Sequence, residues 1–267
     1  MIWRIAGILV WMAAAQAAPR EVIAVTDEIQ PMAALAGFLE TNGYAVAVLD
    51  QPKFLARRPA GPPYAMLMYI HNNLDAAAEA ALIAYARGGG RLVVLHHGIA
   101  SAKMRNKQWL PFAGIVLLAR DHPAHPWKVA FGDVEVVNLN PGHYVTSHKV
   151  NYDRTVAYRP RDEPSVEQQL PGFLLPDTEI YFNQLFSDGR QKTVLLGLKS
   201  RVEGALHTDD RAGWYKPVEK GHLFYFQQGH HARDFEHPAF RQIILNSLEW
   251  PPEPRPQAPS NRSAFSR

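Results

Sequence analysis

Two pairs of adjacent histidines are the main candidates in this sequence for residues that could do chemistry. His96-His97 follows one apolar run typical of a buried strand, and His230-His231 follows another. Imidazole can act as a general acid or base near neutral pH, and it is also a common metal ligand. Because neighbouring side chains diverge in an extended chain, we expect one member of each pair to face a shared site.

A carboxylate that could belong to the same site lies within residues 177–181. Glu179 and Tyr181 point to one face if this segment is extended. A carboxylate beside a phenol could bind sugar hydroxyls, or the carboxylate could orient a histidine. A solvated acidic turn beside a core tyrosine is the alternative. The candidate catalytic residues are His96, His97, His230 and Glu179.

Imidazoles together with a carboxylate also form the ligand set of many divalent-metal sites. The same residue types are compatible with metal-free acid–base chemistry, so the residues alone leave both roles open. The candidate metal ligands are His96, His230 and Glu179, and the cofactor that they would hold is a divalent metal.

Other side chains could contact a small-molecule substrate. Two of them follow predicted strands, one is the phenol beside Glu179, and one is an indole that could stack on a sugar ring or pack in the core. The candidate substrate-binding residues are Asp27, His71, Tyr181 and Trp214.

Alternating strands and helices would position these groups. The predicted helices are 30–42 and 75–87, and the predicted strands are 21–25, 44–49, 64–70 and 91–95. This spacing predicts parallel βαβ units, so the expected fold class is α/β, with a doubly wound, mostly parallel sheet and helices on both faces. Right-handed crossovers would place Asp27, His71 and His96 along one edge.

The pattern is less regular in several segments. We predict a loop rich in Pro and Arg at 51–63 and a hairpin turn at Gly132-Asp133. Residues 139–176 are turn-rich and predict a long excursion from the sheet, of the kind that often covers an active site. Further strands are predicted at 179–185, 193–198 and 222–227, and a last helix at 238–248.

Composition restricts the class of protein. The chain has 267 residues, a formal net charge of +3 and no cysteine. The positive charge comes from the two ends of the chain, so it is no evidence for a nucleic-acid partner. The absence of cysteine excludes a disulfide framework and a thiolate nucleophile. The motifs of serine hydrolases, dinucleotide enzymes, P-loop proteins and zincins are also absent.

Both ends of the chain predict segments outside the fold. Residues 1–17 have a basic start, a short apolar stretch and an Ala-x-Ala end, which predict a signal peptide and a periplasmic or secreted protein. The apolar stretch is too short to span a bilayer, so we expect no stable membrane span after cleavage. Residues 251–267 are rich in proline and predict a disordered tail, which leaves 18–250 as one domain.

The order of several short motifs resembles the trehalose-utilisation (ThuA-like) family. Residues 88–96 match that family's triple glycine, strand and Leu-His, and 177–181 resemble its acidic element. The remaining matches are Trp214, Lys220-Gly221, Phe224 to Phe226, Gly229-His230, Phe235, Pro238, Phe240 and Trp250. The chain departs from the family pattern at Tyr144, Thr178 and His222. The resemblance spans about residues 20–250, in order along one domain.

This resemblance implies a flavodoxin-like fold similar to that of class I glutamine amidotransferases. Those relatives carry a nucleophilic cysteine after the strand that matches 92–95, where this chain has His96-His97, so thiolate-dependent glutamine hydrolysis is excluded. The family is associated with disaccharides and their keto derivatives. We therefore expect an exported enzyme that acts on a carbohydrate by hydrolysis, elimination or isomerisation. A non-catalytic sugar-binding or scaffold domain is the alternative.

Overall fold

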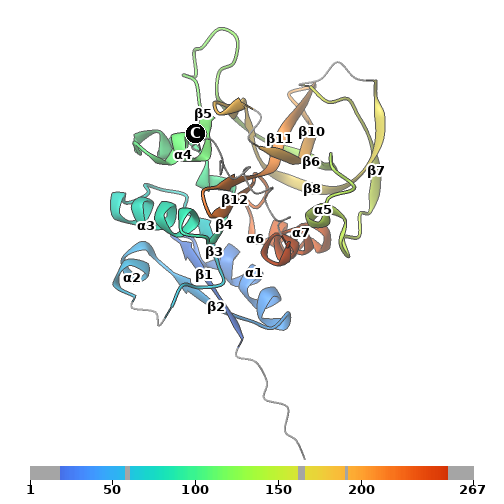
Figure 1. The fold of residues 1–267 in the computed structure, drawn as a ribbon. Helices are drawn as coiled ribbons and strands as arrows, with labels where there is room; N and C mark the ends of the chain where they lie inside the picture. The colour runs from blue at the N-terminus through green and yellow to red at the C-terminus, as the bar shows by residue number, and fades with distance from the viewer. Residues whose placement is uncertain (1–18, 58–60, 162–165, 190–191, 252–267) are drawn as a thin grey trace, which may run out of the picture.

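A computed structural model describes residues 19–57, 61–161, 166–189 and 192–251. The predicted signal peptide at 1–17 lies outside these residues, and so does the predicted tail beyond residue 251. Within them, one ten-stranded sheet runs through the molecule in the order β2-β1-β3-β4-β12-β11-β10-β6-β8-β7 (Figure 1). No helix of this described part is long and apolar enough to cross a membrane.

Half of the sheet is parallel and has the flavodoxin-like strand order. Its strands are β1 (Arg20–Thr26), β2 (Tyr44–Leu49), β3 (Ala65–Tyr69), β4 (Arg91–Leu95) and β12 (Gly221–Phe226). All five residues of β3 are buried, as the continuous apolar runs of strands covered on both faces require. The doubly wound α/β fold predicted from the sequence is therefore confirmed.

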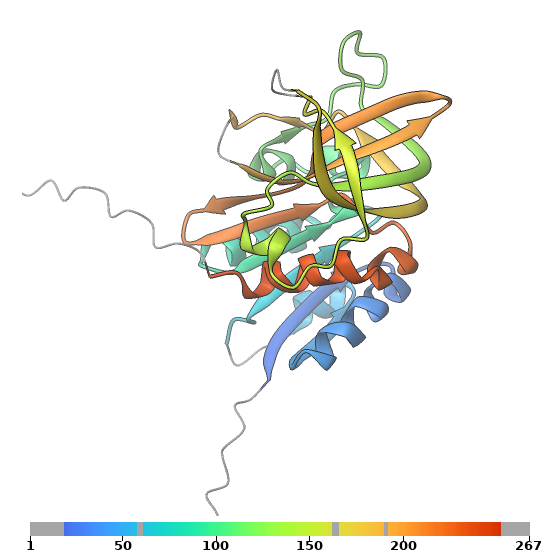
Figure 2. The same ribbon diagram turned by 90° about the vertical axis from the view of Figure 1, so that its right-hand side faces the viewer.

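Helices cover both faces of this parallel half. One face packs against α1 (Ile29–Thr41), α6 (Ala232–Glu236) and α7 (Pro238–Glu249), and the other against α2 (Gln51–Ala56), α3 (Ala76–Arg87) and α4 (Trp109–Ala113). Val22 and Ala24 of β1 face the first layer, whereas Ile23 and Val25 face the second. Figure 2 shows α7 beside α1 on the same face. Because successive side chains of a strand point to opposite faces, the same strands contribute to two separate hydrophobic cores, one on each side of the sheet.

The other half of the sheet is antiparallel, and the sequence did not predict its extent. Its strands are β6 (Lys128–Asn138), β7 (Arg154–Tyr158), β8 (Gln168–Phe182), β10 (Thr193–Val202) and β11 (Ala205–Val218). A short α5 (Tyr144–Ser147) and a small sheet of β5 (Ile115–Val116) and β9 (Leu185–Phe186) complete the described elements.

Three predictions of local structure were wrong. The 139–176 excursion contains β7 and much of β8, so it extends the sheet instead of covering it. Gly132-Asp133 is no hairpin turn, because β6 continues through a bulge opposite β8 at this point. Helix α2 lies in the predicted 51–63 loop, where Asp50 caps it by accepting from the Lys53 N–H at 2.8 Å.

A buried lysine anchors the loop after β3. Lys103 lies in the 3-10 turn η2 (Ser101–Arg105) and is fully buried. Its Nζ donates to the carbonyl oxygens of Ile70 at 2.7 Å, His71 at 3.3 Å and Asn72 at 2.8 Å. Burial lowers the pKa of Lys103 to about 8, although Asp27 opposes this shift.

The first prediction concerns Gly221, at the start of β12. A Cβ at this position would overlap the carbonyl oxygens of Ala86 and Gly90, which are backbone atoms with little freedom to move. We expect Gly221→Ala to lower the free energy of unfolding by about 2–3 kcal/mol. Gly37 in α1 has no atom within 4 Å of the added Cβ, so Gly37→Ala should raise that free energy by about 0.5–1 kcal/mol. Denaturant unfolding of both variants measures this, and equal stabilities would contradict it.

The second prediction follows from Lys103. Between pH 8 and pH 10.5 the unfolded chain holds this lysine's proton while the folded chain releases it. Lys103 should therefore contribute a rise in the free energy of unfolding with pH in this window, of at most about 3 kcal/mol relative to Lys103→Met. Lys103→Met removes this pH-dependent contribution to stability. The wild type and the variant share all other titrating groups, so the difference between them reports Lys103 alone. Denaturant unfolding at both pH values gives the two slopes, and parallel slopes would refute the assignment.

Candidate active site

The candidate site lies at the carboxyl ends of the parallel strands, where open α/β sheets bind their ligands. β4 leads into the 3-10 turn η1 (His96–Gly98), and β12 leads through Gln227 to His230. The antiparallel strand β8 crosses to this edge and contributes Glu179 and Tyr181. Two halves of the sheet therefore meet in one group of polar side chains.

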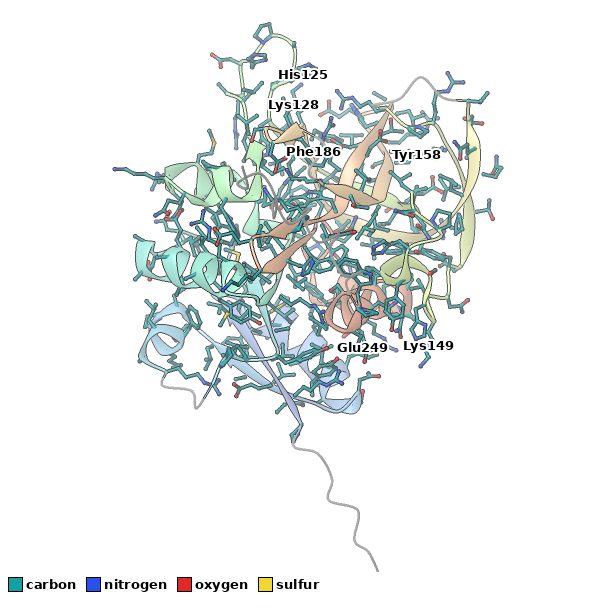
Figure 3. The ribbon with its side chains drawn as sticks, viewed as in Figure 1. His125, Lys128, Lys149, Tyr158, Phe186 and Glu249 are labelled. Atoms are coloured by element: carbon teal, nitrogen blue, oxygen red, sulfur yellow. The ribbon has the colours of Figure 1, made fainter. Side chains whose placement is uncertain are left out.

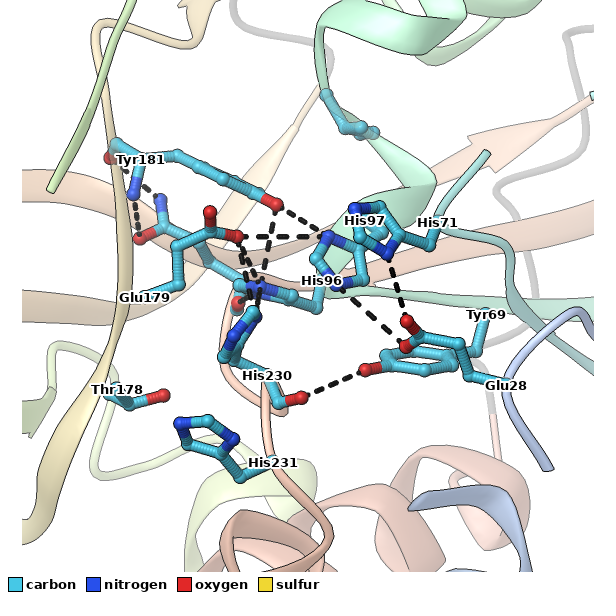
Figure 4. Close-up of polar contacts among 12 residues, drawn as sticks. Glu28, Tyr69, His71, His96, His97, Thr178, Glu179, Tyr181, His230 and His231 are labelled. Atoms are coloured by element: carbon cyan, nitrogen blue, oxygen red, sulfur yellow. Dashed lines mark hydrogen bonds and ion pairs between the residues drawn. The ribbon is translucent and has the colours of Figure 1, made fainter. Parts of the chain in front are cut away.

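Both histidines of the first pair face this group, contrary to the expectation that one would point away. His96 has a φ of 39°, and the chain turns directly from β4 into η1, so the alternation of an extended strand does not apply. The second pair does divide as expected. His230 points toward Glu179, whereas His231 lies away from the carboxylate, beside Thr178 (Figure 4).

One oxygen of Glu179 is the centre of the group. Its Oε2 lies 2.9 Å from His96 Nε2, 3.4 Å from His230 Nδ1 and 3.7 Å from His97 Nδ1. His96 Nε2 and His230 Nδ1 are themselves 3.2 Å apart. Burial by itself would raise the pKa of Glu179, but its contacts with His230, His96 and Tyr181 outweigh this effect and hold the pKa well below its usual range. Glu179 is therefore an anion.

His96 is held from its other side by the main chain. Its Nδ1 contacts the carbonyl oxygen of Gln227, and its ring stacks on Tyr181 with centroids 4.7 Å apart. The side chain is fully buried. Burial is the main reason that the pKa of His96 is lowered, which favours the neutral imidazole.

His97 connects the group to a second carboxylate. Its Nδ1 lies 2.7 Å from the Tyr181 hydroxyl, and its ring stacks on His71 at 4.1 Å. His71 Nδ1 in turn lies 2.8 Å from Glu28 Oε1, and His97 Nε2 lies 3.9 Å from Glu28 Oε2. Burial is the largest of the causes that lower the pKa of His97, followed by the neighbouring imidazoles. Burial also raises the pKa of Tyr181, so this phenol keeps its proton and can donate it to His97.

A cavity of about 380 Å³ opens beside the group. Its wall is mostly polar and includes residues that carry amides, a hydroxyl and a guanidinium besides the carboxylate. The lining residues are His71, Asn72, Asn73, His97, Ala100, Ser101, Ala102, Arg120, Trp127, Val129, Glu179 and Tyr181. Fully buried His96 lies behind this wall, not in it.

Two predicted substrate-binding residues lie elsewhere. Asp27 accepts from the His71 N–H at 2.7 Å and the Asn72 N–H at 2.8 Å, so it holds the loop that lines the cavity without lining it. Trp214 is fully buried in the core against Tyr225. The loop with His125 projects from the molecule (Figure 3), and the rings of His122 and His125 in this loop stack with centroids 6.5 Å apart.

Sequence reasoning missed three contributors. Glu28 lies one residue beyond the predicted Asp27, and Gln227 ends a predicted strand, so their strand-end positions were the available signal. The sequence gives no indication of the role of Lys103, because this role depends on a turn that brings η2 against the loop after β3.

Three solved structures of known proteins have folds similar to that of this chain. A putative ThuA-like protein from Bacteroides uniformis shares 17% sequence identity over 90% of this chain and 94% of its own, with a TM-score of 0.59. A cytoplasmic protein from Salmonella typhimurium shares 12% identity over 86% and 98%, with a TM-score of 0.52. A β-galactosidase from Rahnella sp. R3 matches 86% of this chain with 31% of its own, at 11% identity and a TM-score of 0.51.

These identities are low, so the three structures establish similarity of fold alone. No curated protein matches the chain in sequence. The sequence profile of the ThuA family, described as trehalose utilisation, matches residues 8–251, which is nearly the whole chain. The chain therefore belongs to the ThuA family.

Proposed function

We propose that this protein is an exported enzyme that acts on a sugar or keto-sugar, with Glu179 as the residue that meets the substrate. The observation that carries the proposal is an ionised carboxylate in the wall of a polar cavity, with imidazole nitrogens at 2.9 and 3.4 Å from one of its oxygens. Perturbed titratable groups that converge in a cavity are typical of catalytic sites. The family's description, trehalose utilisation, supports a carbohydrate substrate.

The cavity has the chemistry that a small carbohydrate needs. Asn72 and Asn73 supply amides, Ser101 supplies a hydroxyl, and Arg120 supplies a guanidinium. Sugar hydroxyls both donate and accept hydrogen bonds, so a wall of mixed donors and acceptors fits them. Trp127 adds an aromatic surface to the same wall.

The four predicted catalytic residues take different roles in this proposal. Glu179 has 13% of its side chain exposed and His230 has 19%, whereas His96 has none. Glu179 can therefore accept a hydrogen bond from a substrate hydroxyl, or stabilise positive charge that develops at an anomeric carbon. His96 acts through Glu179 as a positioning residue, and the hydrogen bond between the Tyr181 hydroxyl and His97 Nδ1 fixes both side chains at the cavity wall.

Hydrolysis, elimination and isomerisation of a keto-sugar all require proton transfer at or next to a polarised carbon–oxygen bond. One carboxylate with an adjacent proton donor supplies this requirement in each case. The absence of cysteine restricts covalent chemistry to oxygen and nitrogen nucleophiles.

The third prediction tests this function with disaccharides and their 3-keto derivatives as substrates. Glu179→Gln keeps the shape of the side chain and removes its charge, so kcat/KM should fall by at least about 100-fold. His230→Gln should lower kcat/KM as well, because it removes a partner of the carboxylate.

The matched control is His231→Asn. It removes the neighbouring imidazole, and asparagine suits the N-cap of α6 that His231 occupies, so kcat/KM should stay near the wild-type value. Wild-type turnover by Glu179→Gln would overturn the role of this carboxylate. Binding of the sugars without turnover by the wild type would instead support a non-catalytic sugar-binding domain.

The fourth prediction concerns export. When the full chain is expressed in a Gram-negative host, the protein should be recovered from the periplasm with a mass that begins at Ala18. Ala15→Leu should block processing, because it removes a small residue that the cleavage site requires. Periplasmic fractionation and intact mass measure both outcomes. A wild-type protein that keeps Met1 and stays in the cytoplasm would contradict export.

A further inference from the structure

The main chain fixes the tautomer of His96. Its Nδ1 faces the carbonyl oxygen of Gln227, and a carbonyl oxygen can only accept a hydrogen bond. Nδ1 must therefore carry the proton. In the neutral imidazole the remaining nitrogen, Nε2, then presents a lone pair.

That lone pair faces other electron-rich atoms. Glu179 Oε2 lies 2.9 Å from His96 Nε2, and His230 Nδ1 lies at 3.2 Å. Two acceptors at this separation need a proton or a cation between them. A second proton on His96 would meet this need, but it would place a doubly protonated imidazole in a fully buried position.

The geometry of the three atoms fits a metal ion. His96 Nε2, Glu179 Oε2 and His230 Nδ1 form a triangle with edges of 2.9, 3.2 and 3.4 Å. Tetrahedral zinc with bonds of about 2.0–2.1 Å places its ligands about 3.3 Å apart. His97 Nδ1 lies farther from Glu179 Oε2, at 3.7 Å, and is engaged by the Tyr181 hydroxyl.

The surroundings hold the ligands as they are held in known metal sites, where the second nitrogen of a ligating histidine donates to a carbonyl or carboxylate. The Gln227 carbonyl does this for His96. His230 is fixed by its own main chain, whose carbonyl accepts from the Tyr69 hydroxyl at 3.1 Å. Gly229 next to it has a φ of 108° and lies against Phe235, so the backbone there admits no larger residue.

We propose that His96 Nε2, Glu179 Oε2 and His230 Nδ1 bind one divalent transition-metal ion of the zinc class, with an open position for a further ligand. This inference deepens the proposed function and rests on it for the role of the metal: an ion beside the cavity would polarise a sugar carbonyl or acidify a bound water. Binding of the ion itself depends only on the three side chains. Glu28, His71 and His97 form the competing arrangement among the described residues.

The fifth prediction is tested by metal binding without substrate. The mature protein is stripped with a chelator and titrated with Zn²⁺ in equilibrium dialysis, and with Co²⁺ while its visible absorbance is recorded. We expect one ion per chain and a Co²⁺ spectrum typical of four-coordinate nitrogen and oxygen ligands. His230→Gln and Glu179→Gln should each weaken Zn²⁺ binding by at least about 100-fold.

Two controls locate the ion. His231→Asn keeps the neighbouring backbone, and His71→Gln removes a member of the competing arrangement. Both should bind Zn²⁺ like the wild type. Loss of binding in His71→Gln with retention in His230→Gln would overturn the assignment, and so would absence of binding by a folded wild type.

The metal and the function can fail separately. A bound ion that His230→Gln releases, in a protein without turnover, would support the metal site and count against the enzyme. Full turnover by the chelated protein, with no ion bound, would support the enzyme and refute the metal site.

Discussion

The contact between Glu179 and the histidines joins two parts of the molecule that have different architectures. The carboxylate comes from β8 in the antiparallel half, whereas His96 and His230 follow parallel strands. The histidines and Tyr181 keep this largely buried carboxylate ionised, and such a charge without partners would be costly. The site contacts thus add to the β11–β12 pairing and the shared apolar core that also join the two halves.

Around this contact the elements have separate tasks. The parallel half supplies the imidazoles and, through Asp27 and Lys103, a fixed loop after β3. The antiparallel half supplies the carboxylate and Tyr181, and the segment that leads into it brings Arg120 and Trp127 to the cavity. Groups that could react and groups that could select a substrate thus come from different stretches of the chain.

The sequence predicted the parallel half well, because continuous apolar runs and alternating helices have local signatures. It also identified His96, His97, His230 and Glu179, all of which lie in one group. The antiparallel half was mostly missed, since the pairing of β8 with β6 and β7 depends on contacts distant in sequence. The prediction that only one histidine of the first pair would face the site was wrong. The backbone turns at His96, and the spacing of residues in the sequence gives no sign of this turn.

The position of β12 has a consequence for the order of folding. This strand lies between β4 and β11, yet it consists of residues 221–226, close to the end of the chain. During synthesis β1 to β4 can pair early, as can β6, β8, β10 and β11, but the two sheets have no shared strand until β12 emerges. The synthesis of β12 therefore unites the sheet, and His230 follows directly after this strand, so intermediates that lack this segment carry an open edge on β4 and an incomplete group of histidines.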